Sequence, residues 1–499
     1  MKNMQLQNYT LLVECEGENR DAQATVEATG DGLNVFLTAT ESRPSFVRLC
    51  WTFKSDGDLQ VLGDAFERSY GDLGFRRLRD NARWMPWYFL ATDGTAHWCF
   101  GVKTQPNAFV SFYYHESGLA ATLDCRCGGC GVRLCGRKLL LASFVLRQYE
   151  DCTAFDALHR FCKTLCERPL LPQTMIYGGN NWYYAYGESD YETILSDVKL
   201  QSALADGIEN RPFMVVDDGW QQNRCVGPWL PNEKFPDMRR LADEMRSVGV
   251  RPGIWIRPLE TKDPNVPECW KIERGGARTY LDPTVPGVQD LLRSDLRRIR
   301  GWGYELLKYD FTTYDLFGDW GKDLGETITN ETGWHFFDQS KTGAEIVKDL
   351  YRLILEESGD MLLIGCNTVS HLCAGLVHIN RTGDDTSGKD WARTRKMGVN
   401  TLAFRLAQNG AFYLVDADCV GILGDHIPWD KNRQWLDLLS KSGTALFVSC
   451  NKADDTQMRD LKAAFHAAQQ PHTIVPLDWT DTKLPQRWLI DGEPVTYVW

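Results

Sequence analysis

Residues 304–311 read YELLKYDF, an apolar run that ends in a cation and an anion two positions apart. Successive side chains of a strand point to opposite sides, so Lys308 and Asp310 share one side and Tyr309 points to the other. In parallel sheets built from alternating strands and helices, functional residues gather at the carboxyl ends of the strands. We therefore expect this stretch to be a strand that carries charged side chains into a site.

Eight apolar segments alternate with amphipathic helices between residues 170 and 469. The helices include 235–249 and 288–303, in which apolar residues recur every three or four positions. Eight β–α units in one region predict a (β/α)8 TIM barrel, a parallel sheet closed on itself. The predicted strands are 175–181, 212–217, 251–256, 304–310, 361–366, 376–381, 401–404 and 411–415.

The flanking regions have different patterns. Residues 1–152 contain short alternating stretches such as VRLCWTF (47–53) and AFVSFYY (108–114), which predict an N-terminal antiparallel β-sandwich. A linker helix is expected over 153–169. Residues 470–499 contain an Asp-Gly turn between two short strands and predict a small C-terminal β segment. The chain is therefore expected to be a multidomain α/β plus all-β protein.

Composition excludes some classes of partner. The 499 residues carry a formal net charge of −12 and show no basic stripe, so we expect no nucleic-acid partner. No run of about 18 apolar residues occurs, so we expect no membrane partner. The first residues lack the basic and apolar regions of a signal peptide, and a cytoplasmic location is predicted.

The sixteen cysteines are spread along the chain and are expected to be reduced thiols. Four of them, Cys125, Cys127, Cys130 and Cys135, have the spacing C-x-C-x2-C-x4-C. Common zinc modules use paired C-x2-C units instead. We therefore favour small buried residues over a metal site for this cluster.

Polar residues follow most of the predicted barrel strands. Taken singly, each has an ordinary structural explanation: an Asp caps a helix or a turn, a Trp or Cys packs in the core, and Lys308 with Asp310 forms an ion pair. All these strand ends should face one cavity, which favours a functional site. The residues are Asp217, Asp218, Trp255, Arg257, Lys308, Asp310, Cys366, Arg381, Asp384 and Asp385.

The charges at these strand ends suggest a reaction. A cation at Lys308 should lower the pKa of Asp310 and keep this carboxylate ionised as a nucleophile. A second carboxylate from the sixth strand, in a less compensated place, would stay protonated and donate a proton. This set of residues fits glycoside hydrolysis. It has two carboxyl groups with opposed protonation states, further acids that bind hydroxyls, and Trp faces that stack on C–H surfaces.

Five segments in this order resemble glycoside hydrolase family 36, the α-galactosidase (melibiase) family of clan D. They are VVDDGWQ (215–221), GIWIRP (253–258), LLKYDF (306–311), IGCN (364–367) and RTGDDT (381–386). The resemblance covers roughly residues 170–430, and YGDLGF, MPWYFL and GVKT in the N-terminal region also fit the family. It implies a retaining, exo-acting enzyme that hydrolyses terminal α-galactosides of oligosaccharides or other glycosides without a metal or organic cofactor.

The resemblance assigns roles residue by residue. Asp310 matches the nucleophile and Asp385 the general acid/base, with the adjacent Asp384 as second choice. In a retaining enzyme the two carboxyl groups lie about 5 to 5.5 Å apart. The resemblance also implies a homo-oligomer as one assembly state. The matched substrate-binding positions are Asp217, Asp218, Trp255, Lys308, Cys366, Arg381, Trp182, Tyr183, Thr368 and Asp72.

Several alternatives remain open. Asn367 and Thr368 stand where the family has small residues beside the sugar O2, so α-N-acetylgalactosaminides or other α-hexosides are alternative substrates. The same scaffold also supports α-galactosyl transfer or carbohydrate binding without catalysis. Arg257 either recognises an anionic group or pairs with an acid, and we favour pairing.

Overall fold

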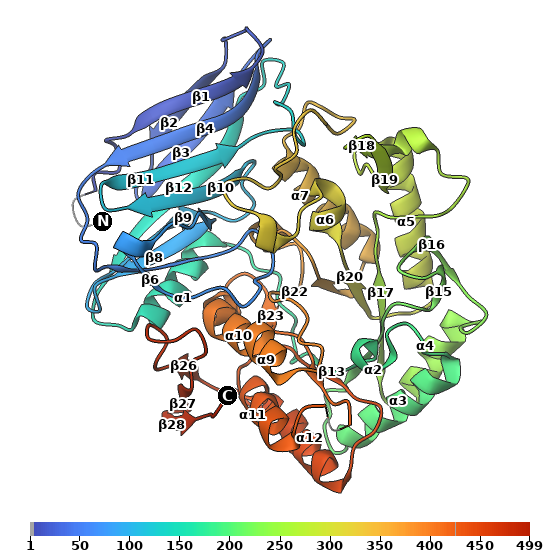
Figure 1. Ribbon diagram of the computed structural model, residues 1–499. Helices are drawn as coiled ribbons and strands as arrows, with labels where there is room; N and C mark the ends of the chain where they lie inside the picture. Colours follow the sequence, from blue (N-terminus) through green and yellow to red (C-terminus); the bar gives the residue numbers. More distant parts are fainter. Residues whose placement is uncertain (1–3, 425) are drawn as a thin grey trace.

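The computed structural model describes residues 4–424 and 426–499 (Figure 1). In this described part of the chain, no helix is both long enough and apolar enough to cross a bilayer. A two-sheet region forms the N-terminal part, and a region of parallel strands with outer helices follows it (Figure 1). A small antiparallel sheet lies near the C-terminus.

The N-terminal region is an antiparallel β-sandwich, as predicted. Aromatic rings from both sheets meet between them: Trp51 and Phe112 from one sheet contact Phe100 and Phe144 from the other. One sheet has the order β1 (Thr10–Glu16), β4 (Arg43–Thr52), β11 (Gly118–Asp124), β10 (Phe109–His115), β7 (Met85–Pro86). The other has the order β2 (Gln23–Ala28), β3 (Gly32–Thr38), β12 (Leu139–Tyr149), β9 (His97–Val102), β8 (Tyr88–Thr92), β5 (Gln60–Gly63), β6 (Arg76–Arg77).

The central region is a (β/α) barrel, as predicted. Its parallel strands lie in the order in which they follow one another along the chain. A parallel bridge between Asp416 and Ala445 joins the end of the seventh strand to the residue before the eighth, and this contact closes the ring. The strands are β13 (Tyr177–Asn180), β14 (Phe213–Val216), β17 (Arg251–Ile256), β20 (Leu306–Tyr309), β21 (Leu362–Gly365), β22 (Ile379–Arg381), β23 (Leu414–Asp416) and β25 (Leu446–Ser449), with β24 (Val420–Gly421) beside β25.

The predicted strand at 401–404 is wrong. These residues belong to helix α10 (Asn400–Arg405), which continues α9 (Trp391–Thr394) through a π-helical segment at Arg395–Val399. Every residue of α10 is buried, so the helix has no polar face and its sequence lacks the amphipathic period. A short apolar run of this kind does not distinguish a helix from a strand. The eighth strand is instead β25, which the sequence analysis missed.

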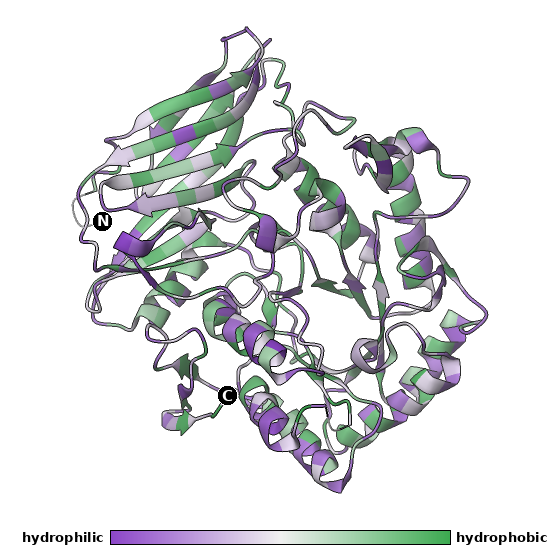
Figure 2. Ribbon diagram, in the orientation of Figure 1, coloured by the Kyte–Doolittle hydropathy of each residue, from purple (hydrophilic) through white to green (hydrophobic). Residues whose placement is uncertain are grey.

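Helices surround the barrel, and many of them are amphipathic. Figure 2 shows hydrophilic and hydrophobic residues side by side on the outer helices, whereas the sandwich strands carry long hydrophobic stretches. The main helices are α3 (Tyr191–Leu204), α4 (Met238–Ser247), α5 (Pro286–Gly301), α7 (Gly343–Ser358), α11 (Trp429–Ser440) and α12 (Asp455–Ala468). Shorter elements in the connections are α2 (Trp182–Ala185), α6 (Thr312–Phe317), α8 (Ser370–Cys373) and the hairpins β15–β16 (Gln221–Asn223, Val226–Pro231) and β18–β19 (Lys271–Arg274, Ala277–Leu281).

Helix α1 (Ala154–Leu165) lies between sandwich and barrel. The Thr153 side chain accepts a hydrogen bond from the backbone N–H of Asp156 and caps its start. His159 Nδ1 lies 2.9 Å from the carbonyl oxygen of Ala407 in the barrel. At the other end of the chain, β26 (Ile474–Pro476), β27 (Arg487–Ile490) and β28 (Glu493–Thr496) form an antiparallel sheet. The turn at Asp491 and Gly492, both with positive φ, joins its last two strands.

The loop after β5 of the sandwich contacts the carboxyl end of barrel strand β22. Ser69 in this loop forms a parallel bridge with Gly383. The Ser69 N–H donates to the Thr382 carbonyl at 2.9 Å, and the Asp384 N–H donates to the Ser69 carbonyl at 3.0 Å. Buried Arg405 of α10 pairs with Asp64 at 2.8 Å in the same loop. The loop is therefore held against the carboxyl end of a barrel strand.

We predict that Thr342 joins helix α7 to the sandwich. Its hydroxyl accepts from the Glu345 N–H at 3.1 Å and donates to the Asn107 carbonyl at 2.7 Å. Thr342→Ala should lower the free energy of unfolding by about 1–2 kcal/mol, because both hydrogen bonds are lost. Thr342→Ser keeps the hydroxyl and should stay near the wild type in chemical denaturation. Equal stability of the two variants would contradict this role.

Candidate active site

Asp310 lies directly after strand β20, with its side chain almost completely buried. Its N–H donates to the Ile256 carbonyl at 3.0 Å, which continues the pairing of β20 with β17. The carboxylate accepts hydrogen bonds from Trp255 Nε1 at 3.2 Å, Asn367 Nδ2 at 2.8 Å and the Phe311 N–H at 2.8 Å. Three donors on one carboxylate favour its ionised form.

Charged neighbours also act on Asp310. Burial by itself raises its pKa, but the positive charges of Lys308 and Arg68, with the hydrogen bonds from Asn367 and Trp255, leave the pKa below its ordinary value. Lys308 acts without direct contact, because its Nζ pairs with Asp217 Oδ2 at 2.8 Å. The predicted effect of Lys308 on Asp310 is thus present, although the ion pair itself is made with another acid.

The Asp217–Asp218 pair follows strand β14, and both side chains are nearly buried. Asp217 Oδ2 accepts from Asn180 Nδ2 at 2.7 Å as well as from Lys308. Asp218 Oδ1 accepts from Gln221 Nε2 at 2.6 Å and from the Cys225 N–H at 2.7 Å. Burial raises the pKa of Asp218. The two acids are held by neutral donors, by Lys308 at Asp217 and by Arg224, whose Nε lies 3.7 Å from Asp218 Oδ2.

Asp385 lies on the other side of the charge network and is partly exposed, at 37% of its side chain. Its Oδ1 is 3.0 Å from Arg381 Nη2 and 3.8 Å from Arg68 Nη1. Burial and the charge of Asp310 raise the pKa of Asp385, but Arg381, Arg68 and Lys308 together hold it below the ordinary value. The expectation of a less compensated second carboxylate is therefore wrong for the free protein, because two arginines face it.

Arg68 is the most important residue that the sequence analysis missed. It comes from the sandwich loop that carries Ser69, and it is 7% exposed. Its guanidinium lies 3.3 Å from Asp384 and 3.8 Å from Asp385, and its charge also lowers the pKa of Asp310. It packs 5.6 Å from the ring of Trp320. The signal in the sequence was the charged pair at 67–68, which precedes the YGDLGF motif.

A second buried network holds Arg381. Its Nη2 lies 2.7 Å from Asp418 Oδ2 and 3.4 Å from the Tyr183 hydroxyl, and this hydroxyl donates to Asp418. Tyr183 therefore positions Arg381, while the neighbouring Trp182 ring lies 5.1 Å from the Tyr186 ring. Asp418 was not predicted. It follows β23 in the sequence and carries no motif that distinguishes it from a turn residue.

The two residues after Cys366 have different hydrogen-bond partners. Cys366 is buried between Asp310, Lys308 and Arg381, and burial together with the charge of Asp310 raises the pKa of its thiol. Asn367, in a left-handed backbone conformation at φ 54°, directs its amide to Asp310. Thr368 turns away and donates to Asn380 Oδ1 at 2.6 Å. Asn367 therefore contacts the candidate nucleophile.

Asp384 and Arg257 are held by ion pairs. Asp384 lies between Arg68 at 3.3 Å and Arg393 at 2.8 Å. Arg257 pairs with Asp315 at 2.6 Å and with Glu260 at 2.7 Å, so the prediction that it pairs with an acid is confirmed. In the described residues, no group of three or more His, Cys, Asp or Glu side chains is arranged to hold a metal ion.

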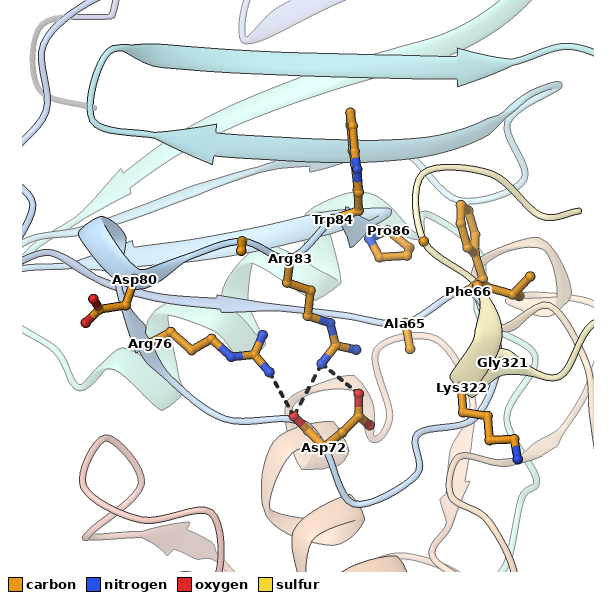
Figure 3. Close-up of a pocket in the computed structure, with 13 residues that line it drawn as sticks. Ala65, Phe66, Asp72, Arg76, Asp80, Arg83, Trp84, Pro86, Gly321 and Lys322 are labelled. Carbon is orange, nitrogen blue, oxygen red and sulfur yellow. Dashed lines mark hydrogen bonds and ion pairs between the residues drawn. The ribbon is translucent and has the colours of Figure 1, made fainter. Parts of the chain in front are cut away.

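Asp72 lies apart from this network. Its Oδ2 pairs with Arg83 at 2.8 Å and its Oδ1 accepts from the Tyr70 N–H at 3.1 Å. It lines a separate hollow between the sandwich and residues 321–325 (Figure 3). The sandwich residue that contacts the carboxylates of the barrel is thus Arg68, four positions earlier in the same loop.

Solved structures with the same fold are α-galactosidases. One from Thermus thermophilus, in complex with p-nitrophenyl α-D-galactopyranoside, has a TM-score of 0.64 at 17% identity, over 98% of this chain and 97% of that chain. A GH36 α-galactosidase from Geobacillus stearothermophilus has a TM-score of 0.59 at 13% identity, over 98% and 77%. The α-galactosidase from Lactobacillus brevis has a TM-score of 0.59 at 14% identity, over 96% and 72%.

The chain has the fold of the GH36 α-galactosidases. The resemblance predicted from five short segments is thereby confirmed at the level of the fold. No protein-family model and no curated protein sequence matches the chain. The likeness therefore rests on the three-dimensional arrangement and on the motifs at the strand ends.

We predict that Lys308 is essential for the stability of the site. Lys308→Met removes the cation that pairs with buried Asp217 and should lower the free energy of unfolding by about 3–5 kcal/mol. Lys322→Met, at the surface of the same domain, should have no measurable effect. Chemical denaturation of both variants at neutral pH checks this. Equal stability would contradict the pairing.

Proposed function

We propose that the chain is a retaining, exo-acting α-galactosidase that hydrolyses terminal α-galactosides. The observation that carries this proposal is the almost fully buried Asp310 carboxylate, which accepts hydrogen bonds from Trp255 and Asn367, together with the second carboxylate Asp385, which lies 3.8 Å from Arg68. The chain shares its fold with α-galactosidases, and of the solved structures one contains stachyose and another contains raffinose. Both observations support an oligosaccharide substrate.

In the proposed first step, the Asp310 carboxylate attacks the anomeric carbon of the galactoside. The bond to the leaving-group oxygen breaks as the carboxyl proton of Asp385 passes to that oxygen, which leaves a galactosyl ester on Asp310. Asp217 and Asp218 accept hydrogen bonds from sugar hydroxyls and orient the ring. The donors on Asp310 from Trp255 and Asn367 hold the carboxylate in line for attack.

In the second step, Asp385 removes a proton from water, whose oxygen attacks the anomeric carbon and releases Asp310. In this proposal one residue serves as acid and then as base because the charge beside it changes between the two steps. In the free protein the negative charge of Asp310 partly offsets the lowering of the Asp385 pKa by Arg381, Arg68 and Lys308, and the uptake of the proton for the first step depends on this charge. That charge disappears when the ester forms. Arg381 and Arg68 then favour the ionised base, so the change at Asp310 itself switches the role of Asp385.

The first test is Asp310→Gly. Without its nucleophile, the protein should lose about 10³-fold or more of its turnover of p-nitrophenyl α-galactoside. Azide fits the space left by the side chain and should restore release of nitrophenol, with β-galactosyl azide as product, because attack on the α-galactoside inverts the anomeric carbon. Asp290→Ala, on the exposed face of α5, is the control with normal turnover. Unchanged activity of Asp310→Gly, or an α-galactosyl azide product, would contradict the proposal.

The second test is the pH dependence of Arg68→Gln. The guanidinium lowers the pKa of both Asp310 and Asp385, so its removal should raise both. The acid limb of the kcat/KM profile requires ionised Asp310 and the alkaline limb requires protonated Asp385, so both limbs should move to higher pH. Arg68→Lys retains the charge and should keep the profile close to that of the wild type. Identical profiles for the Gln and Lys variants would refute this electrostatic role.

A further inference from the structure

A hollow of about 430 Å³ lies between the sandwich and residues 321–325 of the barrel (Figure 3). Apart from Asp72, none of the residues assigned above to the candidate active site lines it. Phe66, Trp84 and Pro86 form an apolar part of its wall, and charged side chains from the β6 region form another part. Its volume falls in the range of ligand pockets.

The charged part of this wall has more positive than negative groups. Arg76, Arg83 and Lys322 line the hollow together with Asp72 and Asp80. Figure 3 shows the guanidinium groups of Arg76 and Arg83 directed to Asp72, whereas the Asp80 carboxylate points away from them.

Arg76 has no carboxylate partner of its own. The Asp72 carboxylate pairs with Arg83 at 2.8 Å, whereas Arg76 Nη2 reaches only the Asp72 carbonyl oxygen, at 3.3 Å. Across residues 4–424 and 426–499, no carboxylate oxygen lies within 4.0 Å of the Arg76 guanidinium. Burial and the charge of Arg83 lower the pKa of Arg76, and the charge of Asp72 opposes them only in part.

We propose that this hollow binds an oxyanion, a carboxylate, sulfate or phosphate group carried by a sugar, between Arg76 and Arg83. Guanidinium groups bind such anions through paired N–H donors, and an oxyanion here would neutralise the surplus positive charge. A free ion would fill a small part of the volume, so the apolar residues are available for the C–H faces of a sugar ring. The oxyanion follows from the positions of the two guanidinium groups, and the sugar rests on the proposed function.

The strand that carries Arg76 also supplies a matched control. Arg77 is the next residue of β6 and therefore points to the opposite face. Its side chain is 64% exposed and lies 3.6 Å from Asp58. Arg76→Gln and Arg77→Gln thus remove the same charge from neighbouring positions, but only the first removes it from the hollow. Melting temperatures of both variants confirm that the full chain is folded.

The experiment is isothermal titration calorimetry of the full chain at low, fixed ionic strength with galactose 6-phosphate, galactose and inorganic phosphate. We expect galactose 6-phosphate to bind the wild type and Arg77→Gln equally and to bind Arg76→Gln at least about ten-fold more weakly, because a charge-assisted contact is lost. Galactose should bind all three proteins equally. The comparison with galactose distinguishes binding in the hollow from binding of the sugar in the barrel site.

Three results decide the outcome. Weaker binding confined to Arg76→Gln supports the site. No binding of either phosphate compound to the wild type, or equal binding to the two variants, overturns it. Inorganic phosphate could bind as tightly as galactose 6-phosphate and lose the same affinity in Arg76→Gln. This result would support the oxyanion site and contradict the proposal that a sugar carries the oxyanion. Because no turnover is measured, failure here is distinct from failure of the proposed hydrolysis, which Asp310→Gly tests.

Discussion

The cost of burying carboxylates away from water governs the candidate active site. A buried acid stays ionised only where cations and hydrogen-bond donors compensate it. The barrel supplies this compensation from several strand ends at once: Lys308 faces Asp217, and Arg381 faces Asp385 and Asp418. Arg68 from the sandwich adds to it. Asp310 and Asp385 share the positive charges of Lys308 and Arg68, so a change at Asp310 alters the pKa of Asp385.

In the proposed mechanism, Arg68 makes the sandwich a part of the active site. The loop after β5 forms backbone hydrogen bonds with the residues that follow β22, and these bonds place Arg68 beside Asp384 and Asp385. Arg405 of the fully buried helix α10 anchors the same loop through Asp64. The position of the catalytic acid in the proposed mechanism thus depends on the packing of the sandwich against the barrel.

Sequence patterns predicted the regular parts of the fold well, and the physical reason is periodicity. Strands buried on both sides and helices with one polar face have patterns that can be read locally, as in 251–256 and α4. Helix α10 is buried on every side, so 401–404 resembled a strand. The motif around Asp310 identified the end of β20 because charged residues rarely end an apolar run without a reason.

The sequence by itself determined the antiparallel pattern of the N-terminal region, most of the alternating strands and helices of the barrel and most of the acids at the strand ends, because these follow from local period and residue type. Only the tertiary structure decided which charges meet. Lys308 pairs with Asp217 and not with its strand neighbour Asp310, and Arg68 reaches Asp385 from more than 300 residues away. Such pairings depend on the closure of the barrel and on the docking of the sandwich, and neither is encoded in a local pattern.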